Sequence, residues 1–288
     1  MIIAIVGPTG IGKTALSISL AKHYNAEIIN FDAMQVYEKM DIGTAKVTKE
    51  EMDGVVHHLL SYVNVNTNYS VYDYQKEARS LIDKLLKEKK NIIMVGGTGL
   101  YLKATLYDYR FNKEENTTNY DDLSIEELLN RISKYNYIPK DSNNKRRLVR
   151  ELVKLENNEE IDNNGDKLLY NAKIIGLTTD RETLYDRINK RVDIMIEEGL
   201  VEEVSSLKDK FTTSKALKTA IGYKEFIPYF NSEITLDEVI SKIKQNSRHY
   251  AKRQYTFFNN QLNVTWYQTD FNNFDNTVKL VIEDLDKE

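Results

Sequence analysis

Eight residues near the N-terminus have the types and spacing of a phosphate-binding loop: Gly7, Pro8, Thr9, Gly10, Ile11, Gly12, Lys13 and Thr14. The first and last glycines of this loop permit a tight path and a close approach of the backbone to an anion. Lys13 supplies a positive charge, and the hydroxyl of Thr14 can ligate a metal ion. The loop therefore predicts that a diphosphate or a triphosphate is bound, without indicating which molecule carries it.

Two further stretches that suit chemistry follow apolar, strand-like runs. Asp32 comes directly after the run at 27–31, and Gly96-Gly97-Thr98-Gly99 follows the run at 91–95. A carboxylate at position 32 can hold magnesium, accept a proton from a nucleophile, or simply cap a helix. The glycines either form a tight turn or let a ligand approach the backbone closely. We favour chemistry for both stretches, because the ends of parallel strands meet near the phosphate loop.

Basic residues gather in one helical segment, 236–258, without an acidic residue from 242 to 253. Its cations are Lys242, Lys244, Arg248, Lys252 and Arg253. Positions 244, 248 and 252 lie on one helical face. An ordinary solvated face is one interpretation, but an unmixed basic helix in a chain of net charge −4 favours contact with a nucleic-acid backbone.

Two smaller groups of arginines offer related chemistry. Lys145, Arg146, Arg147 and Arg150 form a second basic cluster. Arg187 and Arg191 are four residues apart on a predicted helix and can both face a diphosphate, where a guanidinium would stabilise the charge of a leaving group. The alternative is that this pair forms ion pairs with Glu182, Asp186 or Asp193.

The elements that must position these residues alternate between strands and helices. Apolar runs at 2–6, 27–31, 91–95, 173–177 and 264–267 are separated by helical patterns, which include 15–24, 183–210, 215–230 and 236–258. This alternation predicts an α/β protein with a parallel sheet flanked by helices, similar to the P-loop NTPases. The sheet pattern lapses between 109 and 172, where 123–135 and 145–155 are typical of amphipathic helices. We therefore expect a core domain of 1–109 and 173–288, and a small helical insertion of 110–172.

Composition narrows the function classes. The 288 residues are 29% charged and 41% hydrophobic, which is typical of a globular protein, and no apolar run approaches the roughly 20 residues of a membrane helix. Cysteine is absent, which excludes disulfides, a thiol nucleophile and Cys-ligated zinc. His57 and His58 are adjacent on a predicted strand and point to opposite faces, so we do not expect a metal site there. We expect a cytoplasmic protein without a signal peptide or a membrane association.

With these motifs assembled, the chain resembles the tRNA dimethylallyltransferase family, also called tRNA isopentenyltransferases, in its bacterial form. The resemblance extends from Ile3 to about Trp266. Its motifs are 7–14, Asp32-Ala-Met-Gln-Val-Tyr37, Met40-Asp-Ile-Gly-Thr-Ala-Lys46, His57-His58-Leu59, Val95-Gly-Gly-Thr-Gly-Leu-Tyr101, 145–150, 175–177, 184–192, Ala220-Ile-Gly-Tyr-Lys-Glu225 and Arg248-x-Tyr-Ala-Lys-Arg-Gln254. The family usually has serine where Ala33 stands, so a contact by that hydroxyl is missing here.

The resemblance implies transfer of the dimethylallyl group of dimethylallyl diphosphate to the exocyclic N6 amine of the adenosine 3′ to the anticodon. It implies that the loop holds the donor diphosphate with Mg²⁺ at Thr14, that Asp32 accepts a proton or hydrogen bond from the amine, and that Arg187 or Arg191 steadies the leaving group. The positions implied to contact the tRNA anticodon stem-loop are Asp32, Ala33, Met34, Gln35, Thr98, Arg146, Arg147, Arg150, Thr219, Gly222, Tyr223 and Lys224. We add Arg248, Lys252 and Arg253 from the basic helix, and we expect a monomer.

The main alternative is a nucleotide or small-molecule kinase, which would share the loop and the sheet. Residues 145–150 would then mimic the arginine-rich lid of such a kinase, and the enzyme would consume ATP without needing tRNA. A GTPase-like switch would need an Asn/Thr-Lys-x-Asp tetrapeptide for guanine, which the sequence lacks.

Overall fold

The computed structural model describes residues 1–111, 120, 122–157 and 165–287. Within these residues, six strands form one sheet in the order β3-β2-β4-β1-β5-β6, and all neighbouring strands are parallel. The strands are β1 (Ile2–Val6), β2 (Ala26–Asn30), β3 (His57–His58), β4 (Asn91–Val95), β5 (Ala172–Thr178) and β6 (Thr265–Gln268). The predicted α/β class is therefore confirmed. The predicted ends of β1 and β4 are correct, and those of β2, β5 and β6 differ by one residue.

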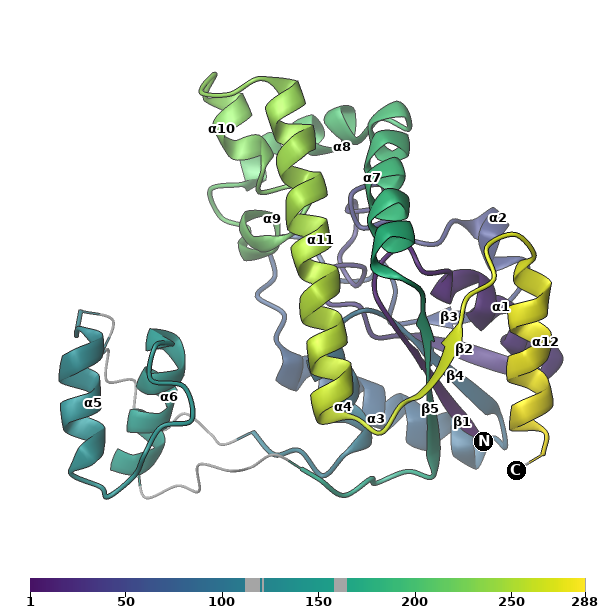
Figure 1. Cartoon of the computed structure of the whole chain (residues 1–288), viewed down its shortest axis with the longest axis horizontal. Coiled ribbons are helices and arrows are strands. Elements are labelled where there is room, and N and C mark those ends of the chain that lie inside the picture. The colour runs from purple at the N-terminus through teal and green to yellow at the C-terminus, as the bar shows by residue number, and fades with distance from the viewer. Residues whose placement is uncertain (112–119, 121, 158–164, 288) are drawn as a thin grey trace. The chain divides into compact units, whose positions relative to one another are not determined.

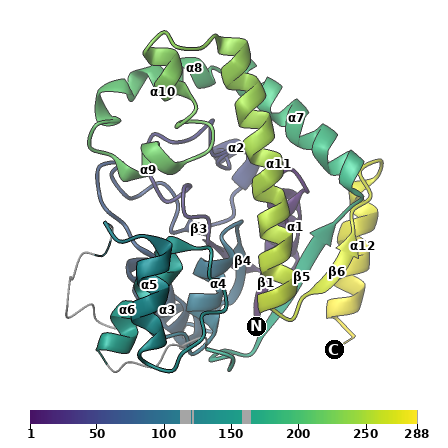
Figure 2. The same cartoon turned by 60° about the vertical axis from the view of Figure 1, so that its left-hand side comes forward.

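Helices surround this sheet and form the insertion (Figure 1). They are α1 (Lys13–His23), α2 (Lys49–Met52), α3 (Val71–Lys87), α4 (Gly99–Leu106), α5 (Ile125–Ser133), α6 (Lys145–Glu156), α7 (Arg181–Glu197), α8 (Leu200–Ser206), the 3₁₀ turn Lys208–Lys210, α9 (Lys215–Thr219), α10 (Phe226–Phe230), α11 (Leu236–Gln261) and α12 (Phe274–Leu285). The helix α11 is the longest of them, with 26 residues, and it packs on α7 and α4 (Figure 2).

Strand β1 is apolar throughout because helices cover both faces of the sheet. Ile2, Ala4 and Val6 pack in one cluster with side chains of α3 and α4. Ile3 and Ile5 point the other way and pack with side chains of α1 and α12. A strand buried on both faces has no polar side to present, which explains its unbroken apolar run.

Two predicted helices are interrupted at glycines. The predicted helix 183–210 divides into α7 and α8 at Gly199, where φ is +99°. The predicted helix 215–230 divides into α9 and α10, and the turn between them contains Gly222 with φ of +92°. Left-handed backbone of this kind ends a helix, and glycine adopts it without a Cβ penalty. These short helices pack with α11 and residues 36–65 in a third apolar cluster.

The chain divides into two compact units, Met1–Tyr107 with Leu168–Glu288, and Asp108–Lys167. Residues 168–172 therefore belong to the sheet-bearing unit, whereas we expected them in the insertion. In this first unit, Leu169 N donates to the carbonyl of Leu106, and Tyr107 forms a β-bridge with Leu168. Part of the expected insertion, 112–119, 121 and 158–164, lies outside the described residues.

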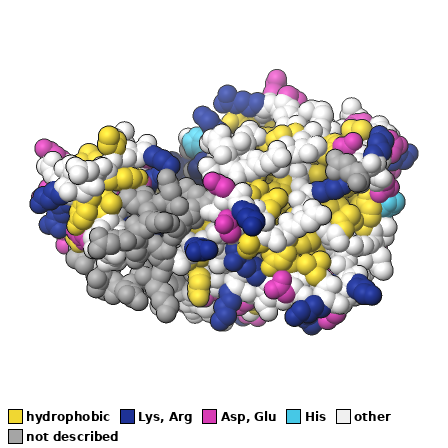
Figure 3. Space-filling model, turned by 90° about the horizontal axis from the view of Figure 1, so that it is seen from below, with side chains coloured by type: hydrophobic (Ala, Val, Ile, Leu, Met, Phe, Trp, Pro, Cys, Tyr) yellow, Lys and Arg dark blue, Asp and Glu magenta, His cyan; other side chains and the backbone are white. Residues whose placement is uncertain are grey.

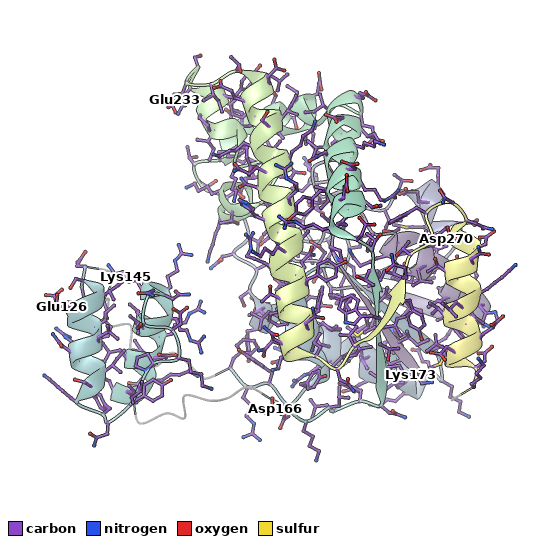
Figure 4. All side chains as sticks on the ribbon, in the orientation of Figure 1. Glu126, Lys145, Asp166, Lys173, Glu233 and Asp270 are labelled. Carbon is purple, nitrogen blue, oxygen red and sulfur yellow. The ribbon has the colours of Figure 1, made fainter. Side chains whose placement is uncertain are left out.

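The second unit has a small core of its own between α5 and α6. Buried leucine and isoleucine side chains of both helices meet there, with Tyr120 beside them. A capping box between Ser124 and Glu127 starts α5, and the Asn144 side chain caps α6. Figure 4 labels Glu126 on α5 and Lys145 on α6.

On the surface seen in Figure 3, apolar patches lie among basic and acidic side chains. No single sign of charge dominates that face. Among the described residues, none of the helices combines the length and the apolar character that crossing a membrane requires.

Candidate active site

The phosphate loop joins β1 to α1 (Figure 1). Its Gly7, Gly10 and Gly12 have φ values of 141°, 80° and 103°, which residues with a Cβ rarely adopt. Gly12 is the N-cap residue of α1, and no acidic side chain lies in the first turn of that helix. The positive end of α1 is therefore available to an anion, together with loop N–H groups other than that of Thr9, which donates to Gln254.

Lys13 is held inside the loop. Its Nζ donates to the carbonyl of Pro8 at 2.7 Å. The pKa of Lys13 is lowered to about 7, chiefly by burial and then by the guanidinium of Arg191, while the carboxylate of Asp32 opposes both effects. The loop thus contains a cation that is costly to keep charged until an anion arrives.

The two arginines of α7 have different roles in the structure. The Nη1 of Arg191 donates to the hydroxyl of Thr9 at 3.1 Å, and its Nη2 donates to the carbonyl of Ala45 at 3.4 Å. Arg187 is more exposed, donates to the carbonyl of Gly10 at 3.0 Å, and lies 3.9 Å from the ring centre of Phe271. Neither arginine forms an ion pair with Glu182, Asp186 or Asp193 among the described residues. Arg191 is thus the one that interacts with both Lys13 and Asp32.

Asp32 uses one oxygen locally and keeps the other available. Its Oδ1 accepts from the backbone N–H of Met34 at 2.9 Å and of Gln35 at 3.4 Å, which stabilises a turn. The first described helix after Asp32 begins at Lys49, so the alternative that Asp32 caps a helix is wrong. Within the described residues its Oδ2 accepts no hydrogen bond, and this oxygen lies beside Gly97, where an added Cβ would come within 3.1 Å of it. Stabilising the turn and accepting a proton are therefore compatible in this carboxylate.

The buried Gln254 was missed as a site residue, although it closes the motif that ends at 254. Its Oε1 accepts from the N–H of Thr9 at 3.1 Å, and its Nε2 donates to the carbonyl of Gly97 at 2.9 Å. It therefore fastens the phosphate loop to the glycine-rich turn. The hydroxyl of Thr98 accepts from the N–H of Ala33 at 2.9 Å and links that turn to the strand end that bears Asp32. Only the pairing of distant segments reveals this role of a glutamine.

These segments enclose a cavity of about 1040 Å³. The predicted residues that line it are Thr9, Gly10, Ile11, Gly12, Lys13, Thr14, Asp32, Ala33, Met34, Gln35, Thr98, Arg187, Arg191, Thr219, Lys224 and Arg253. Gly7 and Pro8 are not among its lining residues. Gly7 passes the carbonyl of Leu177 so closely that a Cβ would lie 2.9 Å from it, and the carbonyl of Pro8 accepts the hydrogen bond from Lys13.

Two of the predicted tRNA contacts are buried. The side chain of Tyr223 is 0% exposed, and its hydroxyl donates to Oε1 of Glu203 at 2.5 Å. Gly222 is buried against Gly43, where its left-handed backbone lets these two segments of the chain approach closely. Contact of these two residues with tRNA stays a prediction, and in this structure neither offers an exposed surface for it. Thr219 and Lys224 do reach the cavity.

The basic face of α11 is divided between internal and external roles. Lys244 forms an ion pair with Asp193 at 2.6 Å, and Arg248 donates to Oδ1 of Asn189 at 2.6 Å. Both partners lie on α7, so these two cations hold α11 against α7. We expected the whole basic face of α11 to be free for nucleic acid, and the structure shows that part of it is used internally. Lys252 and Arg253 are exposed. Contact of α11 with tRNA stays a prediction, now centred on these two residues.

The arginines of α6 are exposed on the second unit. Arg146 and Arg150 have no ion pair among the described residues, whereas the Nε of Arg147 donates to Oε1 of the buried Glu151 at 2.9 Å. Their contact with tRNA also stays a prediction.

The histidine pair is engaged in the sheet. His58 Nε2 lies 2.7 Å from Oε2 of Glu27, and this contact lowers the pKa of that carboxyl. His57 Nδ1 lies 2.9 Å from the carbonyl of Val55. No cluster of three or more His, Cys, Asp or Glu side chains suited to a metal occurs in the described part of the chain. A metal would therefore have to rely on few protein ligands and on the phosphates themselves.

Comparisons with known proteins agree over nearly the whole length. Residues 35–261 match the family described as IPP transferase. A tRNA dimethylallyltransferase of Streptococcus agalactiae is 42% identical over 291 residues, covering 99% of this chain and 97% of that protein. A solved tRNA isopentenylpyrophosphate transferase of Bacillus halodurans is 39% identical, with a TM-score of 0.78 over 99% of this chain and 95% of that one. A solved eukaryotic dimethylallyltransferase acting on tRNA is 27% identical, with a TM-score of 0.80 over 98% of this chain and 77% of that one.

Proposed function

The chain belongs to the IPP transferase family, and from this premise we propose that it is an enzyme that transfers a dimethylallyl group to tRNA. The donor is dimethylallyl diphosphate. The acceptor is the exocyclic N6 amine of the adenosine 3′ to the anticodon, and the product is N6-isopentenyladenosine. The similarity to prenyltransferases supports this function over the kinase alternative. Since the acceptor is tRNA, we propose the cytoplasm as the place of action. We also propose that the active species is a monomer.

One observation supports the proposal most: a carboxylate that follows β2, a lysine at the start of α1 and an arginine on α7 line the same cavity. Asp32, Lys13 and Arg191 all line it, and their charges influence one another. A nucleophilic substitution needs this division, with a proton acceptor on the side of the nucleophile and cations on the side of the leaving group.

The reaction forms one bond and breaks another. The lone pair of N6 attacks the allylic carbon that bears the diphosphate, and the C–O bond breaks with its electron pair leaving on the diphosphate. Asp32 Oδ2 accepts the proton that N6 loses. Arg191, Lys13 and the N–H groups of the loop stabilise the charge on the departing diphosphate, which matters because an amine conjugated with the adenine ring is a weak nucleophile. The adenosine must leave its stack to reach the cavity, which unpaired loops permit.

The residues present fit a Mg²⁺ ion bound mainly by the substrate. Mg²⁺ in phosphate sites commonly uses one or two protein oxygens together with phosphates and water. The hydroxyl of Thr14 lies in the first turn of α1 on the cavity wall and can supply such an oxygen. When bound, the ion would neutralise charge on the diphosphate.

Incubation of the purified protein with labelled dimethylallyl diphosphate, Mg²⁺ and an anticodon stem-loop RNA tests the proposal. We expect label in the RNA, and none in a stem-loop with purine riboside at the acceptor position, because that base lacks the amine. ATP should be neither consumed nor required. Unlabelled RNA combined with ATP turnover would instead establish the kinase alternative.

A further inference from the structure

A glutamate outside the cavity organises one of its walls. Glu203, on α8, accepts hydrogen bonds from three successive backbone N–H groups. Oε2 accepts from Asp41 at 2.9 Å and from Ile42 at 2.8 Å, and Oε1 accepts from Gly43 at 3.0 Å. The hydroxyl of Tyr223 donates a fourth hydrogen bond to Oε1 at 2.5 Å. Four donors on one carboxylate form a charge-assisted anchor that a neutral side chain cannot reproduce.

The anchored segment is a tight turn at residues 41–46. The N–H of Ala45 donates to the carbonyl of Ile42 at 2.8 Å, and the N–H of Lys46 donates to that of Asp41 at 2.9 Å. Ala45 has φ of +46°, a conformation that residues other than glycine rarely adopt. Glu203 supports this turn through the N–H groups of Asp41, Ile42 and Gly43, whereas Gly43, Thr44 and Ala45 line the cavity.

The far side of the turn orients groups of the active site. The carbonyl of Ala45 accepts from Nη2 of Arg191 at 3.4 Å and from Nε2 of Gln35 at 3.2 Å. Gln35 also donates to the carbonyl of Thr44 at 3.1 Å. Because Arg191 also donates to Thr9 of the phosphate loop, a displacement of the turn would remove one of the two hydrogen bonds that aim its guanidinium.

Tyr223 connects the same anchor to the predicted RNA-binding turn. Its ring lies under Gly43, so close that a Cβ there would come within 2.5 Å of it. Thr219 and Lys224, which flank this tyrosine, reach the cavity. One carboxylate thus holds two walls of the cavity in register.

We propose that Glu203 is a positioning residue for dimethylallyl transfer: through the turn at 41–46 it sets the guanidinium of Arg191 against the donor diphosphate. The inference rests on the proposed function. It assigns no contact between Glu203 and substrate, and it assigns the effect on the leaving group to Arg191 rather than to the wall that Tyr223 supports.

The experiment compares Glu203→Gln with Glu202→Gln, its exposed neighbour in the same first turn of α8. We expect Glu203→Gln to lower kcat about tenfold, the equivalent of one lost charge-assisted hydrogen bond, with a smaller change in KM for RNA. Pyrophosphate, titrated without RNA, should bind Glu203→Gln several-fold more weakly. Glu202→Gln should match the wild type in both assays.

A double-mutant cycle separates positioning from mere folding. In an Arg191→Gln background, the effect of Glu203→Gln on kcat should shrink to less than about threefold, because the group it positions is gone. A full loss in that background, or equal behaviour of the two glutamate variants, would overturn the inference. Should Glu203→Gln fail to fold, Tyr223→Phe removes one hydrogen bond to the same carboxylate and enters the same cycle. A wild type that binds pyrophosphate but transfers no label would refute the proposed function alone, since the pyrophosphate arm still decides the role of Glu203.

Discussion

The lysine of the phosphate loop should couple binding of the donor to uptake of a proton. In the free protein, burial and the neighbouring Arg191 lower the pKa of Lys13 to about 7. A diphosphate beside Nζ favours the charged form and raises this pKa. Below pH 7 the free lysine already carries its proton, so binding is at full strength. Above pH 7 the proton must be taken up on binding, so the affinity falls as the pH rises.

The size of the effect follows from the pKa. Each pH unit above about 7 lowers the protonated fraction of the free lysine about tenfold. Between pH 7 and pH 9 the protonated fraction falls from about one half to about 1%, so this contribution to pyrophosphate affinity should fall by roughly 50-fold, or about 2.3 kcal/mol, provided that the bound lysine stays charged. At pH 8 the free lysine is about 90% neutral, and binding should take up close to one proton.

Calorimetric titration with pyrophosphate at pH 8, in buffers of different ionisation enthalpy, measures the number of protons that the protein takes up on binding. Lys13→Met is the matched reference, because pyrophosphate changes its own ionisation equally for both proteins. The ratio of wild-type affinity to Lys13→Met affinity should be constant below pH 7 and fall above it. A ratio that stays constant from pH 6 to pH 9 would refute the reasoning, since Lys13 would then keep its ordinary pKa in the folded protein.

Three further predictions concern the other charged groups. Asp32→Asn keeps an oxygen for the N–H groups of Met34 and Gln35 but cannot accept a proton, so transfer should fall about 10²- to 10⁴-fold in a single-turnover assay, with RNA affinity nearly unchanged. Arg191→Gln should lower kcat about 10²-fold, because a donor aimed at the leaving group is lost, whereas Arg187→Gln should cost several-fold less. Replacing both Lys252 and Arg253 by alanine should weaken RNA binding and reduce the slope of log K against log salt by about two.

Each of these predictions has an outcome that would contradict it, and the last has a control variant. Unchanged turnover in Asp32→Asn would leave that carboxylate with only its role in the turn. Equal losses in the two arginine variants would contradict their different contacts with Thr9 and Gly10. Lys244→Ala should leave the salt slope unaltered, because this lysine pairs with Asp193, and a full slope after loss of the two exposed cations would place RNA elsewhere.

Prediction from the sequence succeeded where the requirement is local. The phosphate loop needs its glycines within eight residues of a strand and a helix, and this order stands in the chain itself. The strands were predictable for the same reason, because burial on both faces demands continuous apolar runs such as Ile2–Val6. The helix boundaries at Gly199 and Gly222 were missed, because an apolar helical period continues across both turns and hides the left-handed glycine.

The sequence alone determined which residue types can bind a diphosphate and accept a proton, because those chemistries depend on side-chain identity and short spacing. Tertiary structure alone decided which of them meet. It separated Arg191 from Arg187, turned Lys244 and Arg248 toward α7, buried Tyr223, and revealed Gln254 and Glu203 as supports. The physical reason is that each of these outcomes depends on a hydrogen bond or packing contact between segments far apart in the chain, and no local pattern records such a partner.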